Sequence, residues 1–262
     1  MVELLAIDAM NLIRRIYAAQ QGREDALANT RQLAQNAIIK CLEETAASHV
    51  VVVFDGHSGT WRHTLFPAYK SQRKPMPEDL AAALQDMKHS FAQQGITSLE
   101  YPHLEADDVI ASLAYKVSGH GGKTWIISTD KGFLQLASEH IVVRHYFEKR
   151  TYVAADVVAQ YGIEPHQLVD YYALVGDTTN EVPGVSKVGP KTASQLLNEY
   201  GDLDNILIHS AEIGGKVAEH LEQDYKKALL ARKLIALKVD CQLGINLQQL
   251  RYRKPEAPWR SS

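Results

Sequence analysis

Carboxylates follow three apolar, strand-like runs of the sequence. Asp8 and Asp55 come directly after such runs, and Asp130 comes shortly after a third. If the strands are parallel, their carboxyl ends meet at one edge of the sheet, where open α/β folds bind ligands. Three acids gathered there would repel one another unless a cation lay among them. Each aspartate alone is also typical of a strand-ending turn. Their shared position therefore carries the prediction of a cation site.

A denser acidic group opens the helical pattern at 106–117. Glu105, Asp107 and Asp108 place three acids within four residues. Acids in a first helical turn also favour the helix dipole, so a structural cap is the alternative. Three of them add repulsion that a cap does not require.

The chemistry that this acid set predicts is hydrolysis assisted by a hard cation. Oxygen ligands without Cys or His at metal spacing suit Mg²⁺ or Mn²⁺. One or two such ions activate water for in-line displacement at a phosphodiester. That reaction needs no nucleophilic side chain, and the sequence carries no Ser-His-Asp or Cys-His motif.

A basic run interleaved with aromatic residues follows Asp55. We expect Lys70 and Arg73 to bind the scissile phosphate, and Tyr69 to stack on an unpaired base. The alternative is a solvated loop.

The segment 182–193 has the composition of a tight hairpin between helical patterns at 167–175 and 191–199. Its glycines permit the turn, and Pro190 suits the first position of the next helix. The N–H groups beside Lys191 and Thr192 would then bind a backbone phosphate without reading a base. A plain connector is the alternative, although two glycines and two prolines exceed what a connector requires. Turn carbonyls could also hold a monovalent cation.

The elements that must position these residues alternate along the chain. Apolar runs predict strands at 4–7, 50–54, 125–127 and 141–143, and helical spacing appears at 26–46, 79–91 and 106–117. This predicts an α/β fold with a mostly parallel central sheet flanked by helices. The expected organisation is a core at 1–155 with an excursion at 74–90, a helical domain at 156–250, and a basic, poorly ordered tail at 251–262.

Composition sets broad limits. The 28 Lys and Arg against 31 Asp and Glu give a net charge of −3, so nucleic acid must be attracted by local patches. The distant Cys41 and Cys241 predict reduced thiols. The sequence shows no signal-peptide pattern and no membrane-spanning run, so we expect a cytoplasmic protein.

From Leu4 to Leu250 the chain resembles the 5′-nuclease or flap endonuclease family, and is similar to the stand-alone bacterial exonuclease IX type. The family's motifs occur in order at 105–108, 128–131, 176–177 and 183–191. The resemblance implies a PIN-like nuclease core with a helix-hairpin-helix (H3TH) subdomain. It also implies a monomeric 5′ flap endonuclease that cuts DNA near single-strand to duplex junctions, as in Okazaki-fragment flap processing during replication and repair.

The resemblance assigns roles residue by residue. It implies a first metal site of Asp8, Asp55, Glu105 and Asp107, and a second of Asp108, Asp130 and Asp177. Lys70 and Arg73 match the basic pair at the scissile phosphate. K⁺ would be held by the carbonyls of Leu174, Val175, Pro183, Val185 and Val188. The residues implied to grip the duplex are Lys187, Val188, Gly189, Pro190, Lys191 and Thr192.

Two positions depart from the family pattern, because Gly132 and Asn180 stand where aspartates are usual. The second metal site has thus lost two carboxylates. We expect one ordered Mg²⁺ in the free protein, bound mainly through Asp107 and its first-site neighbours, which metal titration without DNA would measure.

The stretch at 74–90 resembles the family's helical arch, through which a single-stranded 5′ end passes. Two other functions stay open. One is a DNA-junction binding protein that is weakly active or inactive, and the other is a single-strand ribonuclease, which would have no duplex for the hairpin to grip. A cleavage assay on a 5′-flap duplex separates them.

Overall fold

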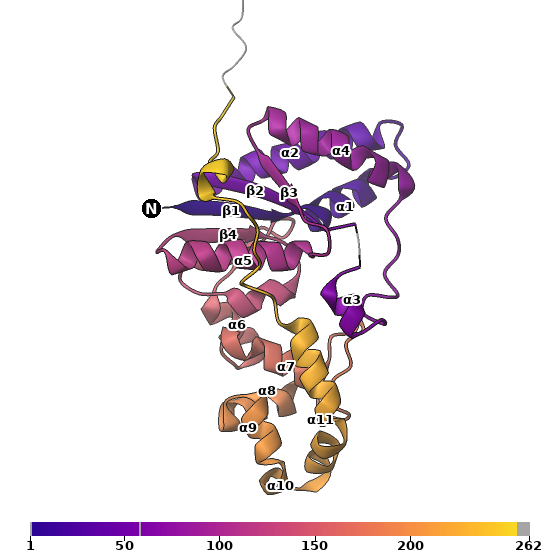
Figure 1. Cartoon of the computed structure of the whole chain (residues 1–262), viewed down its shortest axis with the longest axis vertical. Helices are drawn as coiled ribbons and strands as arrows, with labels where there is room; N and C mark the ends of the chain where they lie inside the picture. Colours follow the sequence, from indigo (N-terminus) through magenta and orange to yellow (C-terminus); the bar gives the residue numbers. More distant parts are fainter. Residues whose placement is uncertain (1, 58, 256–262) are drawn as a thin grey trace, which may run out of the picture.

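A six-stranded sheet forms the centre of the N-terminal part of the chain (Figure 1). The computed structural model describes residues 2–57 and 59–255. The strand order is β3-β2-β1-β4-β5-β6, with β6 the one antiparallel member. The strands are β1 (Glu3–Asp8), β2 (His49–Phe54), β3 (Thr97–Glu100), β4 (Lys123–Ile127), β5 (Ile141–His145) and β6 (Arg150–Tyr152).

Strand register aligns the carboxyl ends at which the acids stand. Asp8 pairs with Val53 across the β1–β2 ladder, and Ile7 pairs with Ile127 across the β1–β4 ladder. Asp55 and Asp130 follow these partners within three residues, so the sheet brings all three acids to one edge.

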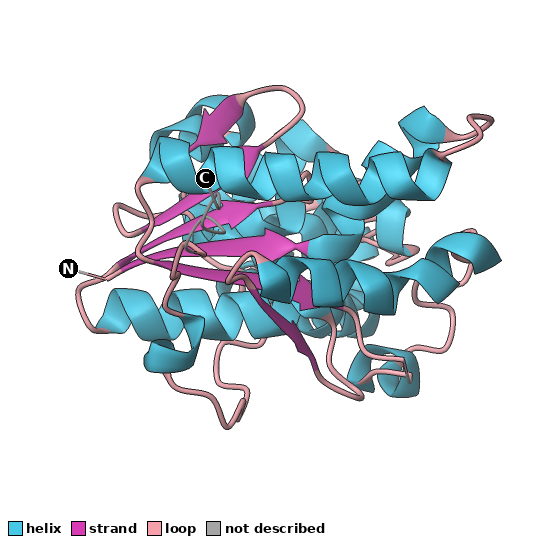
Figure 2. Ribbon diagram, turned by 90° about the horizontal axis from the view of Figure 1, so that it is seen from above, coloured by secondary structure: helices cyan, strands magenta, loops and turns pink. Residues whose placement is uncertain are grey.

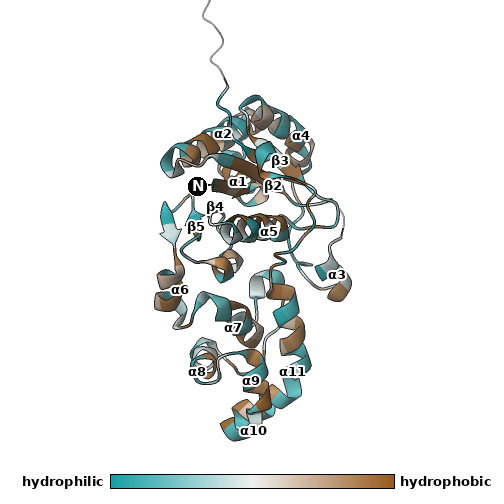
Figure 3. Cartoon of the chain, turned by 60° about the vertical axis from the view of Figure 1, so that its left-hand side comes forward, coloured by the Kyte–Doolittle hydropathy of each residue, from teal (hydrophilic) through white to brown (hydrophobic). Residues whose placement is uncertain are grey.

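Helices cover both faces of the sheet (Figure 2). One face packs against α1 (Ala9–Gln20), α2 (Ala26–Thr45) and α4 (Glu78–Gln93). The other packs against α5 (Ala106–Gly119) and the 3₁₀ turn η1 (Lys131–Leu136). Figure 3 shows hydrophobic residues on β2 and along α5, as expected for elements buried between layers. The short α3 (Trp61–Leu65) lies at the carboxyl edge.

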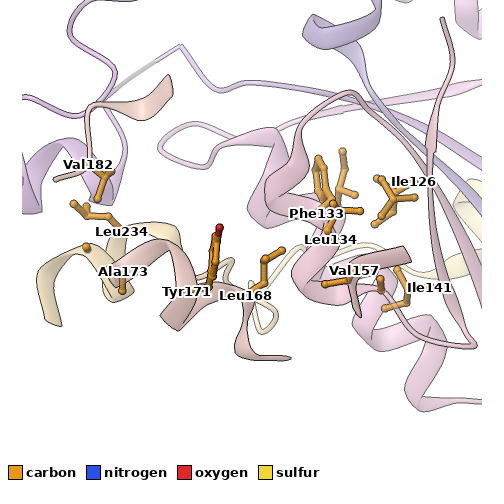
Figure 4. Close-up of a cluster of buried hydrophobic side chains, with 14 of the residues drawn as sticks. Ile126, Phe133, Leu134, Ile141, Val157, Leu168, Tyr171, Ala173, Val182 and Leu234 are labelled. Carbon is orange, nitrogen blue, oxygen red and sulfur yellow. The ribbon is translucent and has the colours of Figure 1, made fainter. Parts of the chain in front are cut away.

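A helical part follows β6 and shares one buried cluster with the sheet. Figure 4 shows Ile126 and Phe133 of the core continuing into Leu168 and Tyr171 of α7. The α-helices are α6 (Ala154–Tyr161), α7 (Leu168–Val175), α8 (Pro190–Tyr200), α9 (Leu203–Ile208), α10 (Ser210–Ile213) and α11 (Gly215–Ile235). The 3₁₀ turns are η2 (Pro165–Gln167), η3 (Thr178–Asn180) and η4 (Leu247–Leu250).

The α/β fold with a mostly parallel sheet and a helical second part is confirmed. All four predicted strands are present, and two were missed. β3 is half-buried throughout and β6 is three residues long and mostly exposed, so neither forms an apolar run.

Two expected loose segments are packed instead. The excursion predicted at 74–90 is largely a packed helix, because α4 buries Leu80, Leu84, Met87 and Phe91 against the sheet and α2. The beginning of the predicted flexible tail is also fixed, since Tyr252 N–H donates to the Ser48 carbonyl and Arg251 pairs with His49. The rest of the tail, 256–262, lies outside the described residues.

Within residues 2–57 and 59–255, no helix has the length and apolar character needed to cross a membrane.

Candidate active site

Acidic and basic side chains share one cavity of about 890 Å³ at the carboxyl edge of the sheet. Asp8, Asp55, Asp107 and Asp130 line it, so the structure brings together the acids of three strand ends and one helix start. Asp177 lines it from the helical part, and Lys70 and Arg73 line it from the loop between α3 and α4.

Asp8 and Asp130 are fixed by the turns that they begin. Asp8 caps α1 by accepting the Asn11 N–H at 3.0 Å, and its second oxygen accepts the Ser128 hydroxyl at 2.9 Å. Asp130 caps η1 by accepting the Gly132 N–H at 2.7 Å. Gly132, which replaces an expected acid, thus contributes only a backbone donor here.

Asp55 and Asp107 meet at the start of α5. Asp55 accepts the Ala106 N–H at 2.9 Å and so holds the first turn of the helix that carries Asp107. The helix start therefore delivers Asp107 to the strand-end acids.

The chain's own electrostatics leave this cluster short of positive charge. Burial, and after it the carboxylate of Asp55, raise the pKa of Asp8 to about 7. Burial raises the pKa of Asp107 well above its usual range; the Lys70 ammonium opposes this, and the carboxylates of Asp130, Asp8 and Asp55 add to it. Carboxylates in such surroundings give up their protons more readily beside a cation.

The donor set fits a hard divalent cation that keeps part of its water shell. All its members are oxygens, the ligands that Mg²⁺ and Mn²⁺ prefer. No group of three or more His, Cys, Asp or Glu among residues 2–57 and 59–255 is arranged to hold a metal ion by itself. Mg²⁺ commonly binds through one or two carboxylates plus waters and substrate phosphates, so this arrangement suits it.

Glu105 holds Lys70 instead of lining the cavity. Its Oε2 accepts from Lys70 Nζ at 2.8 Å and from the Tyr69 hydroxyl at 3.2 Å, and its Oε1 accepts from Thr60 Oγ1 at 2.8 Å. Burial alone would lower the pKa of Lys70, but the carboxylates of Asp107 and Glu105 outweigh it and raise that pKa. Lys70 is therefore a fixed cation beside the acids.

Two site predictions are corrected by burial. Asp108 is fully buried, and both its oxygens accept from the Arg62 guanidinium at 2.8 Å, so it forms a structural ion pair and not a second-site metal ligand. Tyr69 is 4% exposed, with its hydroxyl on Glu105, so it presents no ring on which a base could stack. In both cases the sequence shows the side chain but not the partner that covers it.

Three basic residues at the cavity were missed. Arg14 and Arg15 lie on α1, and Lys131 directly follows Asp130. Arg14 donates to the Lys74 carbonyl at 3.1 Å, which ties α1 to the loop that carries Lys70. The available signal was the position of Arg14 and Arg15 within two helical turns after Asp8, and that of Lys131 next to Asp130.

The hairpin before α8 is tightly folded. The Val185 N–H donates to the Leu174 carbonyl at 2.8 Å, and the Val188 N–H donates to the Val185 carbonyl at 3.2 Å. A Cβ on Gly184 would lie 2.3 Å from the Gly176 nitrogen, so this close approach requires glycine. The turn thus sits directly against the end of α7.

Several side chains of the hairpin and of the start of α8 are exposed to solvent. The side chains of Lys187, Pro190 and Lys191 are exposed, whereas Val188 is 5% exposed. Among the residues that the structure describes, no side chain caps the start of α8, which leaves its first N–H groups available to an anion. Any contact of Val188 with DNA would therefore use its backbone.

The chain thus has an α/β core with acids at its carboxyl edge, followed by a helical part with a tight hairpin. The family model for the 5′-3′ exonuclease N-terminal resolvase-like domain matches residues 3–162, and that for the 5′-3′ exonuclease C-terminal SAM fold matches residues 163–258. The chain belongs to the 5′-3′ exonuclease family.

Curated relatives match the chain along nearly its whole length. The flap endonuclease Xni of Aeromonas hydrophila subsp. hydrophila is 44% identical over 260 residues, covering 97% of each chain. The flap endonuclease Xni of Colwellia psychrerythraea is 42% identical over 265 residues, covering 95% of this chain and 91% of the relative.

Solved structures share the fold at lower identity. T5 5′-exonuclease with bound divalent zinc superposes with a TM-score of 0.78 at 20% identity, covering 90% of both chains. The catalytic core of Rad2 in complex with DNA substrate gives a TM-score of 0.59 at 20% identity, covering 91% of this chain and 80% of that one.

Proposed function

We propose that this chain is a structure-specific 5′ flap endonuclease that hydrolyses DNA phosphodiester bonds near single-strand to duplex junctions. The observation that carries the proposal is the single cavity in which four aspartates face Lys70 and Arg73. The names of its curated relatives support the same activity.

Mg²⁺ is the cofactor that this acid set best fits, with Mn²⁺ able to substitute. The residues that would hold it are Asp8, Asp55, Asp107 and Asp130, with Asp177 from the helical part. When bound, Mg²⁺ would lower the pKa of a coordinated water and stabilise charge on the phosphate oxygens.

The basic residues act on the substrate phosphate. Glu105 holds Lys70 at the cavity wall. The ammonium is therefore already positioned for an incoming phosphate, and the side chain loses little rotamer freedom when the phosphate binds. Arg73 supplies a second, forked donor suited to phosphate oxygens. Arg14 and Arg15 add positive charge on the α1 side of the same cavity.

The hairpin domain would hold the duplex beside the junction. Lys187 and Lys191 are exposed next to the uncapped start of α8, where the N–H groups of Lys191 and Thr192 can bind a backbone phosphate. K⁺ at the turn carbonyls of residues 174, 175, 183, 185 and 188 would add a positive charge facing the same strand.

A labelled 5′-flap duplex incubated with Mg²⁺ tests the proposal. We expect cleavage near the junction by the unmodified chain, and a loss of roughly 100-fold or more in Asp107→Ala, because several kcal/mol of charge stabilisation depend on the acid cluster. A single-stranded RNA of the same length should remain uncut.

A junction-binding protein is the second candidate, because the neutral Gly132 and Asn180 lie beside Asp130 and Asp177 and add no carboxylate for a second ion. Tight flap binding with no cleavage by the unmodified chain, at any Mg²⁺ or Mn²⁺ concentration, would establish that function in place of the nuclease.

A further inference from the structure

A hydrogen-bonded bridge joins the loop that carries Lys70 and Arg73 to the η3 turn of the helical part. Arg73 Nη2 donates to Asn180 Oδ1 at 2.7 Å, and the Lys70 N–H donates to the Asn180 carbonyl at 3.2 Å. The Gln72 N–H donates to Glu181 Oε1 at 3.2 Å. Asn180 thus contacts the loop through both its side chain and its backbone.

The amide of Asn180 matches both of its neighbours. Its oxygen accepts from Arg73, while its Nδ2 donates to Asp177 Oδ2. A carboxylate at this position would keep the first contact, but it would face Asp177 with like charge. The amide therefore joins the acidic Asp177 to the basic Arg73 without needing a cation between them.

Each side of the bridge contains one residue with a left-handed backbone conformation. Lys70 has a φ of 55° and Glu181 a φ of 54°, in the left-handed region that is strained for non-glycine residues. Such conformations persist only where surrounding contacts fix them, and the two residues lie directly against the three bridging hydrogen bonds.

We propose that Asn180 is a positioning residue that fixes Arg73, and with it the phosphate-binding loop, against the helical part before substrate arrives. Arg73 is exposed, and a free arginine would lose side-chain entropy on binding phosphate. Because η3 lies between α7 and the hairpin, the same contact links the duplex grip to the cleavage site. This inference rests on the proposed nuclease function for its kinetic readout.

A double-mutant cycle tests it with the 5′-flap duplex as probe. In single-turnover reactions at saturating enzyme, we expect Asn180→Ala to slow cleavage about tenfold while the Kd for the flap changes less than about threefold, as for loss of one charge-assisted hydrogen bond. Arg73→Ala should slow cleavage at least as much. Adding Asn180→Ala to Arg73→Ala should lower the cleavage rate almost no further.

Asn36→Ala is the matched control, because Asn36 is exposed on α2 and its amide bonds only Gln32 among the described residues. It should cleave at the unmodified rate. Additive losses in the double variant, or an Asn180→Ala rate equal to that of the control, would overturn the proposal.

Hydrogen exchange in the DNA-free chain tests the bridge independently of activity. Asn180→Ala should speed exchange of the amides in 66–77 severalfold, while Asn36→Ala leaves them unchanged. If exchange responds as expected but the unmodified chain cuts no flap, the nuclease proposal fails and the bridge stands. Unchanged exchange in Asn180→Ala would refute the bridge itself.

Discussion

Lys70 is the residue whose surroundings most constrain its role. Glu105 holds the ammonium at 2.8 Å, and the side chain is 13% exposed at the cavity wall. An ammonium fixed there meets the reacting phosphate but covers little of the duplex. We therefore expect Lys70→Ala to lower the single-turnover cleavage rate about 100-fold and to weaken flap binding less than about threefold.

Lys40→Ala provides the control for Lys70, because Lys40 lies on α2 and is 52% exposed beside Glu44. It should change neither rate nor affinity. Equal losses of rate and affinity in Lys70→Ala would reassign Lys70 to simple backbone contact.

Asp8 gives the metal-free chain a distinct pH dependence. Burial and Asp55 raise its pKa from 3.8 to about 7, so the folded chain keeps a proton that the unfolded chain has released. Stability should therefore fall as pH rises from about 4 to about 7. Unfolding measured in a chelator at about pH 5 and about pH 8 should show a smaller fall in Asp8→Asn. Identical falls in the two proteins would contradict this assignment.

At the residue scale, the sequence predicted that the strand-end acids and Asp107 lie together, but not that Glu105 and Asp108 are held by basic partners instead of lining the cavity. Asp8, Asp55, Asp107 and Asp130 share the cavity because register and helix starts follow from local patterns. Asp108 differs because its carboxylate is fully buried and pairs with the Arg62 guanidinium at 2.8 Å. Neighbouring acids in one helical turn point in different directions, and only tertiary packing decides which one is covered.

At the scale of elements, the hairpin before α8 is the most sharply testable. Gly184 lies so close to the end of α7 that an added Cβ would meet the Val175 carbonyl carbon at 2.4 Å. Gly184→Ala should push the hairpin off α7, at a strain of about 1–3 kcal/mol, and weaken duplex binding about tenfold. Gly119→Ala, where a Cβ meets nothing within 4 Å, is the control. Unchanged duplex affinity in Gly184→Ala would mean that the hairpin does not grip DNA.

Elements were predictable where they were long, apolar and local. The sequence predicts β2 because residues 50–54 form an apolar run, and all five of these residues are buried in the structure. The sequence of β6 does not predict a strand, because its three residues form no apolar run. This strand is instead stabilised by its antiparallel pairing with β5. The packing of the segment at 74–90 could not be predicted for a related reason. The apolar spacing at 79–91 correctly gave a helix, but only the sheet and α2 show that its apolar face is buried.

On the scale of the whole molecule, the buried Arg62 joins the two parts of the chain. Its guanidinium donates to Asp108 of α5, to the Leu234 carbonyl at 2.7 Å and to the Ala236 carbonyl at 3.0 Å. The backbone leaving α11 then returns to the core, where the Lys238 N–H donates to Asp108 at 3.0 Å. One ion pair thus fixes the end of the helical part against the nuclease core.

We therefore expect Arg62→Ala to lower the unfolding free energy by about 3–5 kcal/mol, because it leaves Asp108 buried without its cation. Arg232→Ala, which breaks a half-exposed pair with Asp204, should cost about 0–1 kcal/mol. Replacing both partners, as in Arg62→Met with Asp108→Leu, should recover part of the loss, since position 108 then holds no buried carboxylate without its cation, and Glu105 keeps its pair with Lys70. Denaturant unfolding of the four proteins measures these differences. If Arg62→Ala costs no more than Arg232→Ala, the two parts are held together by their shared apolar cluster alone.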